Sequence, residues 1–311
     1  MVEDIIELRI NQKEIPMKDI LSISFNDKAG SKSDKVTLTV KPDFVRPAPN
    51  TKIELEFKTF KDDKVITSLD CGLFHIQTVT RINNKSLSIT ATGVEFNEKQ
   101  KDKISYHYVD TKLSNIVKIV AKRLGHDTNF KTDDLTIKSL HQTNETDINF
   151  LERLADDYNV LFSIKNDVLY FVNKDDATLP KNTIDINKCS SSSIKHSSKT
   201  YYNSCVASWH DLDAGKLVSV TVESGTPVLK IKGAYKDTTE AKLKAKAKLL
   251  QTNKGIIKGS FSSRGLSLYA GTKVNLINTY NNEDDAVYSV ESCNHTWSAT
   301  SGWVSNVEIE N

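Results

Sequence analysis

The first 97 residues carry the alternation of apolar and polar positions that is typical of β-strands. Residues 36–40, 53–57 and 87–91 alternate with a period of two, so each segment has one face to bury and one to expose to water. Turn-forming residues separate these segments, among them Pro47–Asn50 and the Asn83–Asn84 pair. Several short strands at this spacing predict a small barrel or sandwich and not a βαβ unit.

The period changes to that of a helix between residues 104 and 175. One amphipathic helix is predicted to begin after Asp110 or Thr111 and to end at Gly125, and a second is predicted over residues 146–159. The apolar stripe of the first helix consists of Leu113, Ile116, Val117, Val120, Ala121 and Leu124. A β-hairpin is expected over residues 160–172. This segment is therefore predicted to be a compact α+β unit.

The β alternation returns from about Ile184 and is clearest at residues 217–222, 273–277 and 303–309. Residues 241–250 alternate in the same way, yet they are strong helix formers and include no β-branched residue. Asp237 and Glu240 precede this stretch with the spacing of a capping box. Because propensity and capping agree, we predict a helix here.

Composition narrows the class of protein. The chain has 311 residues and a mass of 34.8 kDa, with 38% hydrophobic and 26% charged residues, which is typical of a globular protein with two or three folded units. A net charge of +2 excludes a general polyanion binder. Residues 1–6 lack the layout of a signal peptide, and no apolar run reaches the roughly 18 residues that a membrane helix needs. We therefore expect synthesis in a cytoplasm and no membrane anchor.

Charge is unevenly distributed along the sequence. Residues 236–258 contain seven lysines and two acids, a net of +5, whereas residues 279–311 contain six acids and no Lys or Arg. Two interpretations remain open: a solvated helix face followed by acidic loops, or complementary surfaces on neighbouring subunits of a ring.

No catalytic, cofactor-binding or metal-binding residue is predicted. The sequence contains no Walker loop, G-x-S-x-G, G-x-G-x-x-G or H-E-x-x-H motif. Residues 210–215 could be a calcium loop or a catalytic His–Asp pair, but a polar hairpin tip explains them better. The cysteine and histidine spacings match no common zinc site, which favours buried free thiols at Cys71, Cys189, Cys205 and Cys293. Similarly, a core or interface position is favoured over a ligand platform for Trp209, Trp297 and Trp303.

Residues 105–116 look like the opening of a LysM peptidoglycan-binding module, in which a short strand leads into a helix. The likeness covers one strand and one helix. A shared strand–helix arrangement without sugar binding is the favoured interpretation, and peptidoglycan binding stays open as an alternative.

Two motifs of the middle segment are more specific. Residues 111–125 contain T-K-L-S-N-I-V and A-K-R-L-G, and residues 142–155 match Q-x-x-E-[ST]-D-x-x-F-L-x-R-L-A at every fixed position. With these motifs the chain resembles the phage late control gene D protein family, the baseplate hub proteins of contractile tails. Residues 233–235, 269–274 and 295–297 extend the resemblance towards the C-terminus.

The resemblance implies a mainly β fold with an α+β insertion. Two tube-type β-barrel domains, at residues 1–97 and 181–311, would flank an α+β domain at residues 98–180. Three copies would form a homotrimeric, pseudo-sixfold ring around an axial channel. The acidic residues 279–311 would suit the wall of such a channel, because like charge keeps DNA from adhering. Related type VI secretion spike proteins (VgrG-like) fuse the hub to an OB-fold and a β-helical needle. This sequence stops at Asn311 with no further repeats, so we expect the spike to be a separate chain.

The implied function is structural and not enzymatic, and the family supplies no catalytic residues to transfer. The implied partners are further copies of the chain, the spike, the tail tube protein, the tape-measure protein and other baseplate proteins, with no sequence-specific nucleic acid binding. The implied location is the tail baseplate of a virion or phage-tail-like particle, after synthesis in a bacterial cytoplasm. Two alternatives are kept: a peptidoglycan-binding baseplate component, and a tail-associated cell-wall hydrolase.

Overall fold

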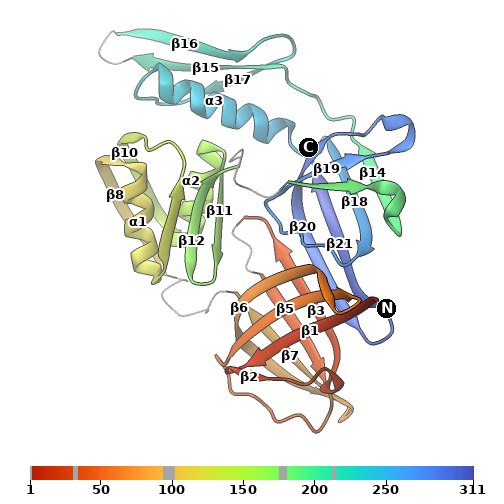
Figure 1. Cartoon of the computed structure of the whole chain (residues 1–311). Coiled ribbons are helices and arrows are strands. Elements are labelled where there is room, and N and C mark those ends of the chain that lie inside the picture. The colour runs from red at the N-terminus through yellow and green to blue at the C-terminus, as the bar shows by residue number, and fades with distance from the viewer. Residues whose placement is uncertain (1, 31–33, 94–101, 175–180, 212–214) are drawn as a thin grey trace.

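The computed structural model describes residues 2–30, 34–93, 102–174, 181–211 and 215–311, which fold mainly into β-sheet (Figure 1). Strands of the first and last segments join in one sheet of thirteen strands. The middle segment and residues 204–253 form smaller sheets that pack against helices. The predicted mainly β class is confirmed.

The first segment contains every strand that the alternation predicted there. Residues 36–40 lie in β4, residues 53–57 in β5 and residues 87–91 in β7. The elements are β1 (Val2–Ile10), β2 (Lys13–Glu14), a 3₁₀ turn (Met17–Asp19), β3 (Ile20–Lys28), β4 (Lys35–Val40), β5 (Lys52–Lys61), β6 (Lys64–Ile82) and β7 (Ser86–Thr92).

The last segment adds six strands to the same sheet. They are β13 (Lys181–Asp185), β14 (Ser191–His196), β18 (Ile257–Arg264), β19 (Lys273–Ile277), β20 (Val287–Ser298) and β21 (Gly302–Glu310). The main path runs β14-β18-β21-β20-β3-β4-β7-β6-β5-β1-β2. Antiparallel pairing of β20 with β3, from Ser292 opposite Lys28 to Ser298 opposite Ser22, makes the two segments one hydrogen-bonded body.

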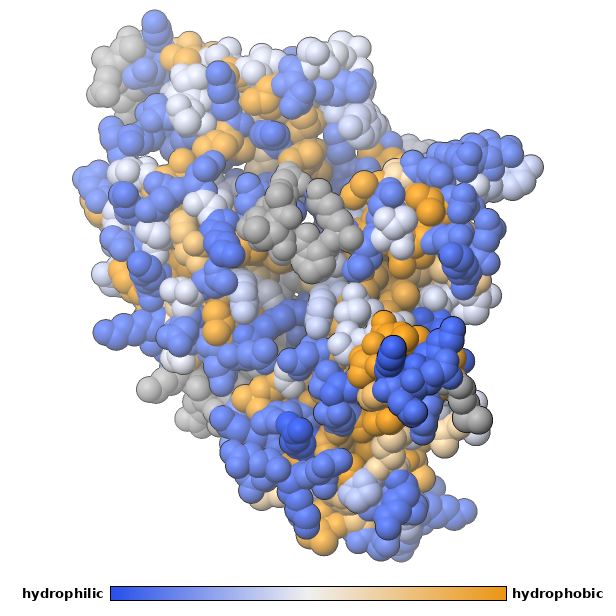
Figure 2. Space-filling view, in the orientation of Figure 1, coloured by the Kyte–Doolittle hydropathy of each residue, from blue (hydrophilic) through white to orange (hydrophobic). Residues whose placement is uncertain are grey.

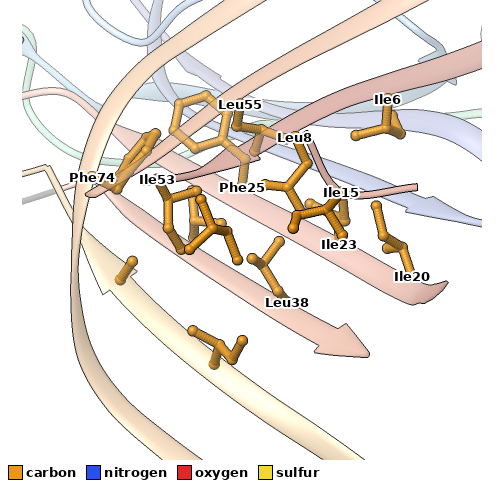
Figure 3. Close-up of a cluster of buried hydrophobic side chains, with 14 of the residues drawn as sticks. Ile6, Leu8, Ile15, Ile20, Ile23, Phe25, Leu38, Ile53, Leu55 and Phe74 are labelled. Atoms are coloured by element: carbon orange, nitrogen blue, oxygen red, sulfur yellow. The ribbon is translucent and has the colours of Figure 1, made fainter. Parts of the chain in front are cut away.

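One hydrophobic cluster fills the space inside the first segment. Inward-facing side chains of β1, β3, β4, β5, β6 and β7 meet there, and Figure 3 shows Leu8, Phe25, Leu38 and Phe74 converging. Trp297 and Trp303 of the last segment belong to the same cluster. The join between the segments is therefore made by packing as well as by backbone hydrogen bonds.

The middle segment is an α+β unit with its own core, as predicted. Two helices pack against its strands, and the buried face of the first coincides with its predicted apolar stripe. The stripe predicted for the second (Ile148, Leu151, Leu154, Ala155, Tyr158) is right in part: Phe150 is buried, whereas Ile148 and Tyr158 are only partly buried. The elements are β8 (Lys103–Lys112), α1 (Leu113–Leu124), β9 (Asp127–Lys131), β10 (Thr136–Thr146), α2 (Asp147–Tyr158), β11 (Val160–Lys165) and β12 (Val168–Asn173).

The predicted N-terminal cap of α1 is wrong. Asp110 and Thr111 lie in β8, and Lys112 precedes the helix without a side-chain cap. The carboxylate of Asp134 accepts hydrogen bonds from the backbone N–H and the hydroxyl of Ser114 instead, at 2.9 and 3.0 Å. A residue twenty positions away thus supplies the acceptor that a local cap normally provides.

Residues 204–253 form a separate layer within the last segment. It consists of β15 (Ser204–Asp211), β16 (Lys216–Glu223), β17 (Val228–Lys232) and α3 (Thr238–Asn253). The helix prediction is confirmed, and Asp237 caps α3 by accepting from the N–H groups of Thr239 and Glu240. The hairpin predicted around residues 210–215 is present as the β15–β16 pair, although residues 212–214 of its tip lie outside the described residues.

Candidate functional site

A buried polar network occupies the middle segment and uses the residues of the specific motif. Arg123 of α1 donates to both carboxylate oxygens of Asp147 at 2.9 and 2.5 Å, and also to Tyr108 and Gln142. Gln142 in turn donates to Asp147 at 2.8 Å. Burial lowers the pKa of Arg123, but the hydrogen bonds to Asp147 and Tyr108 outweigh it and raise that pKa. The guanidinium is therefore a fixed cation that ties four elements together.

The remaining polar positions of the motif also have structural roles. Arg153 pairs with Glu145 at 2.5 Å and donates to the carbonyl of His141 at 2.9 Å. The hydroxyl of Thr146 caps α2 by accepting from the Asn149 N–H. Phe150 is fully buried and stacks on the Tyr108 ring. The motif thus specifies the packing of the α+β unit.

A second polar cluster joins the three segments at one point. Lys165, at the end of β11, places its Nζ 2.7 Å from the Asp27 carboxylate and 3.4 Å from that of Asp34. Asp27 is fully buried at the end of β3, and its second oxygen accepts from the backbone N–H of Ala270 in the last segment. One lysine from the middle segment thus links carboxylates of the first segment to a loop of the last.

The Asp34 carboxylate shares the Lys165 ammonium with Asp27. Two carboxylates face one ammonium, and burial raises the pKa of Asp34 to about 7 although Lys165 opposes the shift. Burial lowers the pKa of Lys165, but the two aspartates raise it by more, so the lysine stays protonated. Near neutral pH the junction therefore holds one firm ion pair and a second carboxylate that exchanges its proton readily.

A cavity of about 320 Å³ lies beside this junction. Its wall is largely apolar and includes Phe25, Phe74, Leu161 and Tyr170. Cys71 also lines it, and burial raises the pKa of that thiol well above its usual value. Since the thiolate is the reactive form of cysteine, this thiol is unsuited to nucleophilic chemistry near neutral pH.

The Cys293–His295 and Cys205–His210 pairs, whose spacings match no common zinc site, lie in different surroundings. Cys293 and His295 are buried, and the His295 ring contacts the Ser305 hydroxyl and the Leu268 carbonyl at 2.9 and 3.1 Å. Burial lowers the pKa of His295 to about 4, so this ring is neutral. Cys205 is buried while His210 is exposed. Among the described residues, no group of three or more His, Cys, Asp or Glu side chains is placed to hold a metal ion.

The core position favoured for the three tryptophans is confirmed. Trp303 stacks on Phe57, and Trp297 is buried in the same cluster. Trp209 packs edge-on against Tyr235 in the core of residues 204–253. In addition, no helix of the described part of the chain is long and apolar enough to cross a membrane.

The two charged stretches meet within one chain. Lys254, from the lysine-rich stretch, forms ion pairs with Glu291 and Glu310 of the acidic stretch, and Lys258 lies 3.7 Å from Glu310. His196 lies 2.6 Å from Asp284. Part of the opposite charge is therefore already paired within one chain.

A scan of family models and a search of curated proteins find no match for this sequence. Solved structures do match over nearly the whole chain. The tail protein from Neisseria meningitidis MC58 has a TM-score of 0.74 at 10% identity, covering 99% of this chain and 97% of its own. The prophage MuSo2 43 kDa tail protein from Shewanella oneidensis has a TM-score of 0.69 at 15% identity, covering 99% and 98%.

A third similar structure comes from a secretion system. The E. coli c3393 protein, a component of the type VI secretion system described as similar to the T4 tail proteins gp27 and gp5, has a TM-score of 0.57 at 12% identity. The match covers 97% of this chain and 76% of that one. The chain therefore has the fold of phage tail proteins, which a type VI secretion component shares.

Proposed function

We propose that the chain is a structural baseplate hub protein of a contractile phage tail or phage-tail-like particle. It connects the tail tube to the central spike and surrounds an axial channel. The observation that carries the proposal is the fold shared, end to end, with two phage tail proteins. The motifs at residues 111–125 and 142–155 support the narrower proposal that it is a late control gene D type hub.

The proposed assembly is a homotrimer. Residues 1–97 and 181–311 of each copy supply two tube-type barrel domains, and residues 98–180 form the insertion between them. The β3–β20 pairing supports this arrangement, because it fixes the two β units side by side in one subunit. Within the described residues, the main path of the sheet ends at β14 and β2, and neighbouring copies in a ring would cover such edges.

The proposed partners follow from the position of a hub. They are two further copies of the chain, a separate spike chain, the tail tube protein, the tape-measure protein and other baseplate proteins. The role is positional and needs no catalytic residue. The LysM-like sequence at β8 and α1 is explained by the Tyr108–Arg123 contact, so we do not propose glycan binding.

Native mass tests the proposal directly. Light scattering after gel filtration is measured on the chain alone and after mixing with the spike chain encoded beside it. A species at three times 34.8 kDa, or a 3:3 complex with the spike, is expected. A chain that stays monomeric in both samples would contradict the hub.

A further inference from the structure

The outward face of four adjacent strands has an unusual composition. Along β20, β3, β4 and β7, the core-facing residues alternate with Ser, Thr and Asn at nearly every outward position. The exceptions lie towards the ends of the strands and not at the centre of the face: Lys28 and Lys35, Leu21 of β3, and Val287 and Glu291 of β20. We call these outward positions of the four strands the hydroxyl face.

Strand register makes the hydroxyl face continuous across the join between the two segments. Thr296 of β20 lies opposite Ser24 of β3, Ser24 opposite Thr37 of β4, and Thr37 opposite Thr90 of β7. The next row includes Asn294 opposite Asn26, and the Ser24 hydroxyl donates to the Asn294 amide oxygen at 3.0 Å. The face therefore belongs to the molecule as a whole and not to either segment alone.

The outward face of the same sheet at β1 and β5 has different chemistry. There Lys58 pairs with Glu7 at 2.7 Å and with Glu56 at 3.1 Å, and Arg9 pairs with Glu54 at 3.7 Å. Alternating charges of this kind are typical of a solvated exterior. The viewed surface of the molecule is likewise mainly hydrophilic, with scattered hydrophobic patches (Figure 2). The sheet thus carries a charged exterior on one side of its core and a neutral face on the other.

The composition of the hydroxyl face argues against an adhesive surface. Protein interfaces are enriched in aromatic residues, Met and Arg at their centres, and the centre of this face has none. Nucleic acid binding depends on Lys and Arg contacts to phosphates, and here the only cations, Lys28 and Lys35, lie at one end. Short neutral side chains hold water and offer a passing polymer neither apolar area nor charge.

We propose that the hydroxyl face lines the axial channel and that the charged β1–β5 face points away from the axis. This inference rests on the proposed hub function, because it requires a ring. The sheet curls around one core that includes Leu38 of β4 and Leu55 of β5, so the outward faces of β4 and β5 point in different directions. The wall is then neutral and hydroxyl-rich, and Glu291 and Glu310 are paired with Lys254 and do not supply an acidic lining.

Gold labelling of single cysteines in assembled rings tests the orientation. Cys71 and Cys189, the two partly exposed thiols, are replaced by Ser, and Thr37→Cys or Asn294→Cys is then introduced on the hydroxyl face. Glu54→Cys, on the exposed outward side of β5, is the matched control. Each protein is reacted with maleimide-linked gold clusters, and end-on views of the rings are averaged by electron microscopy.

The expected result is gold density around the central hole for both Thr37→Cys and Asn294→Cys, and at the rim for Glu54→Cys. Rings with Thr37→Cys and Asn294→Cys gold at the rim would overturn the channel wall while leaving the hub intact. If the unlabelled protein forms no ring, either alone or with the spike chain, the hub itself is refuted and the wall with it. Two positions on different segments are used so that one variant that fails to fold does not decide the outcome.

Discussion

At the scale of single residues, the buried charges of this protein hold segments together. Asp27 continues the core-facing alternation of Ile23 and Phe25, so a charged residue at an inward position was visible in the sequence. Its partner was not visible, because Lys165 lies 138 positions further along the chain. A buried carboxylate can be recognised from periodicity, whereas the cation that compensates it depends on how distant segments dock.

Replacing Lys165 with Met removes the only cation within reach of both Asp27 and Asp34 in the described junction. We expect a loss of about 3–5 kcal/mol in unfolding free energy, because the fully buried Asp27 carboxylate loses its ion pair with Lys165. Urea denaturation, monitored by circular dichroism at pH 8, measures this loss of unfolding free energy. Lys138→Met, at an exposed position of β10, is the control and should change the unfolding free energy by less than about 0.5 kcal/mol. Equal effects of the two substitutions would contradict the junction.

The raised pKa of Asp34 makes stability depend on pH with a definite sign. The folded protein retains the Asp34 proton up to about pH 7, whereas the unfolded chain releases it near the ordinary value of 3.8. The unfolded state therefore binds fewer protons between these values, and stability falls as the pH rises through that window. Asp34→Asn should remove this fall, a gain over wild type of up to about 4 kcal/mol at pH 8 and almost none at pH 4.

The measurement is the urea midpoint of both proteins from pH 4 to pH 8. Burial also raises the pKa of Glu310 to about 7, so the wild-type curve alone does not isolate Asp34. The difference between the wild-type and Asp34→Asn curves isolates the contribution of Asp34, because Glu310 is present in both proteins. A difference that does not change with pH would show that Asp34 does not exchange its proton in this range.

At the scale of elements, the local sequence correctly predicted those helices and strands whose formation depends on interactions between nearby residues. The apolar stripes of α1 and α2 and the propensity of α3 identified the three α-helices that lie within the described residues. The N-terminus of α1 was wrong because its hydrogen-bond acceptor, Asp134, comes from a loop after the helix. The motif at residues 142–155 was recognised as a pattern, but its physical role appeared only when Arg123 was found in contact with Gln142 and Asp147.

The cap of α3 gives a prediction at this scale. Asp237 accepts from two backbone N–H groups at 2.9 and 3.0 Å, and Glu240 accepts from the Lys236 N–H. Asp237→Ala should cost about 1 kcal/mol of helix stability, and Asp237→Ser, which can still cap, only a few tenths. Hydrogen exchange of the first turn of α3 measures the difference. Indistinguishable exchange in the two variants would mean that the side-chain cap does not stabilise the helix.

At the scale of the whole molecule, the decisive feature is a pairing that no local pattern contains. Ser24 and Asn294 are 270 positions apart and hydrogen-bonded, and through β3 and β20 the ends of the chain share one sheet. Alternation identified strands in both segments but not which strand would pair with which. The separate layer at residues 204–253 was also missed, because its strands alternate like those of the large sheet.

The shared sheet predicts how the molecule unfolds. Trp297 and Trp303 come from the last segment but pack in the core of the first, so both segments should lose structure in a single transition. The layer at residues 204–253 has a weaker core, since four of its six buried hydrophobic residues are Cys or Ala. It should therefore open at lower urea concentration. Hydrogen exchange with mass spectrometry across a urea series resolves the two steps by peptide.

Two substitutions separate the steps. Trp209→Ala should lower the urea midpoint of residues 204–253 and leave that of β3 and β20 in place, because its contacts lie within the smaller core. Trp303→Ala should lower the midpoints of β3 and β20 together, at a cost of about 3–5 kcal/mol, because the ring stacks on Phe57 of the first segment. If β3 kept its midpoint while β20 lost structure, the two ends of the chain would be independent domains in contact, and a hub built on a rigid pair of β units would lose its mechanical basis.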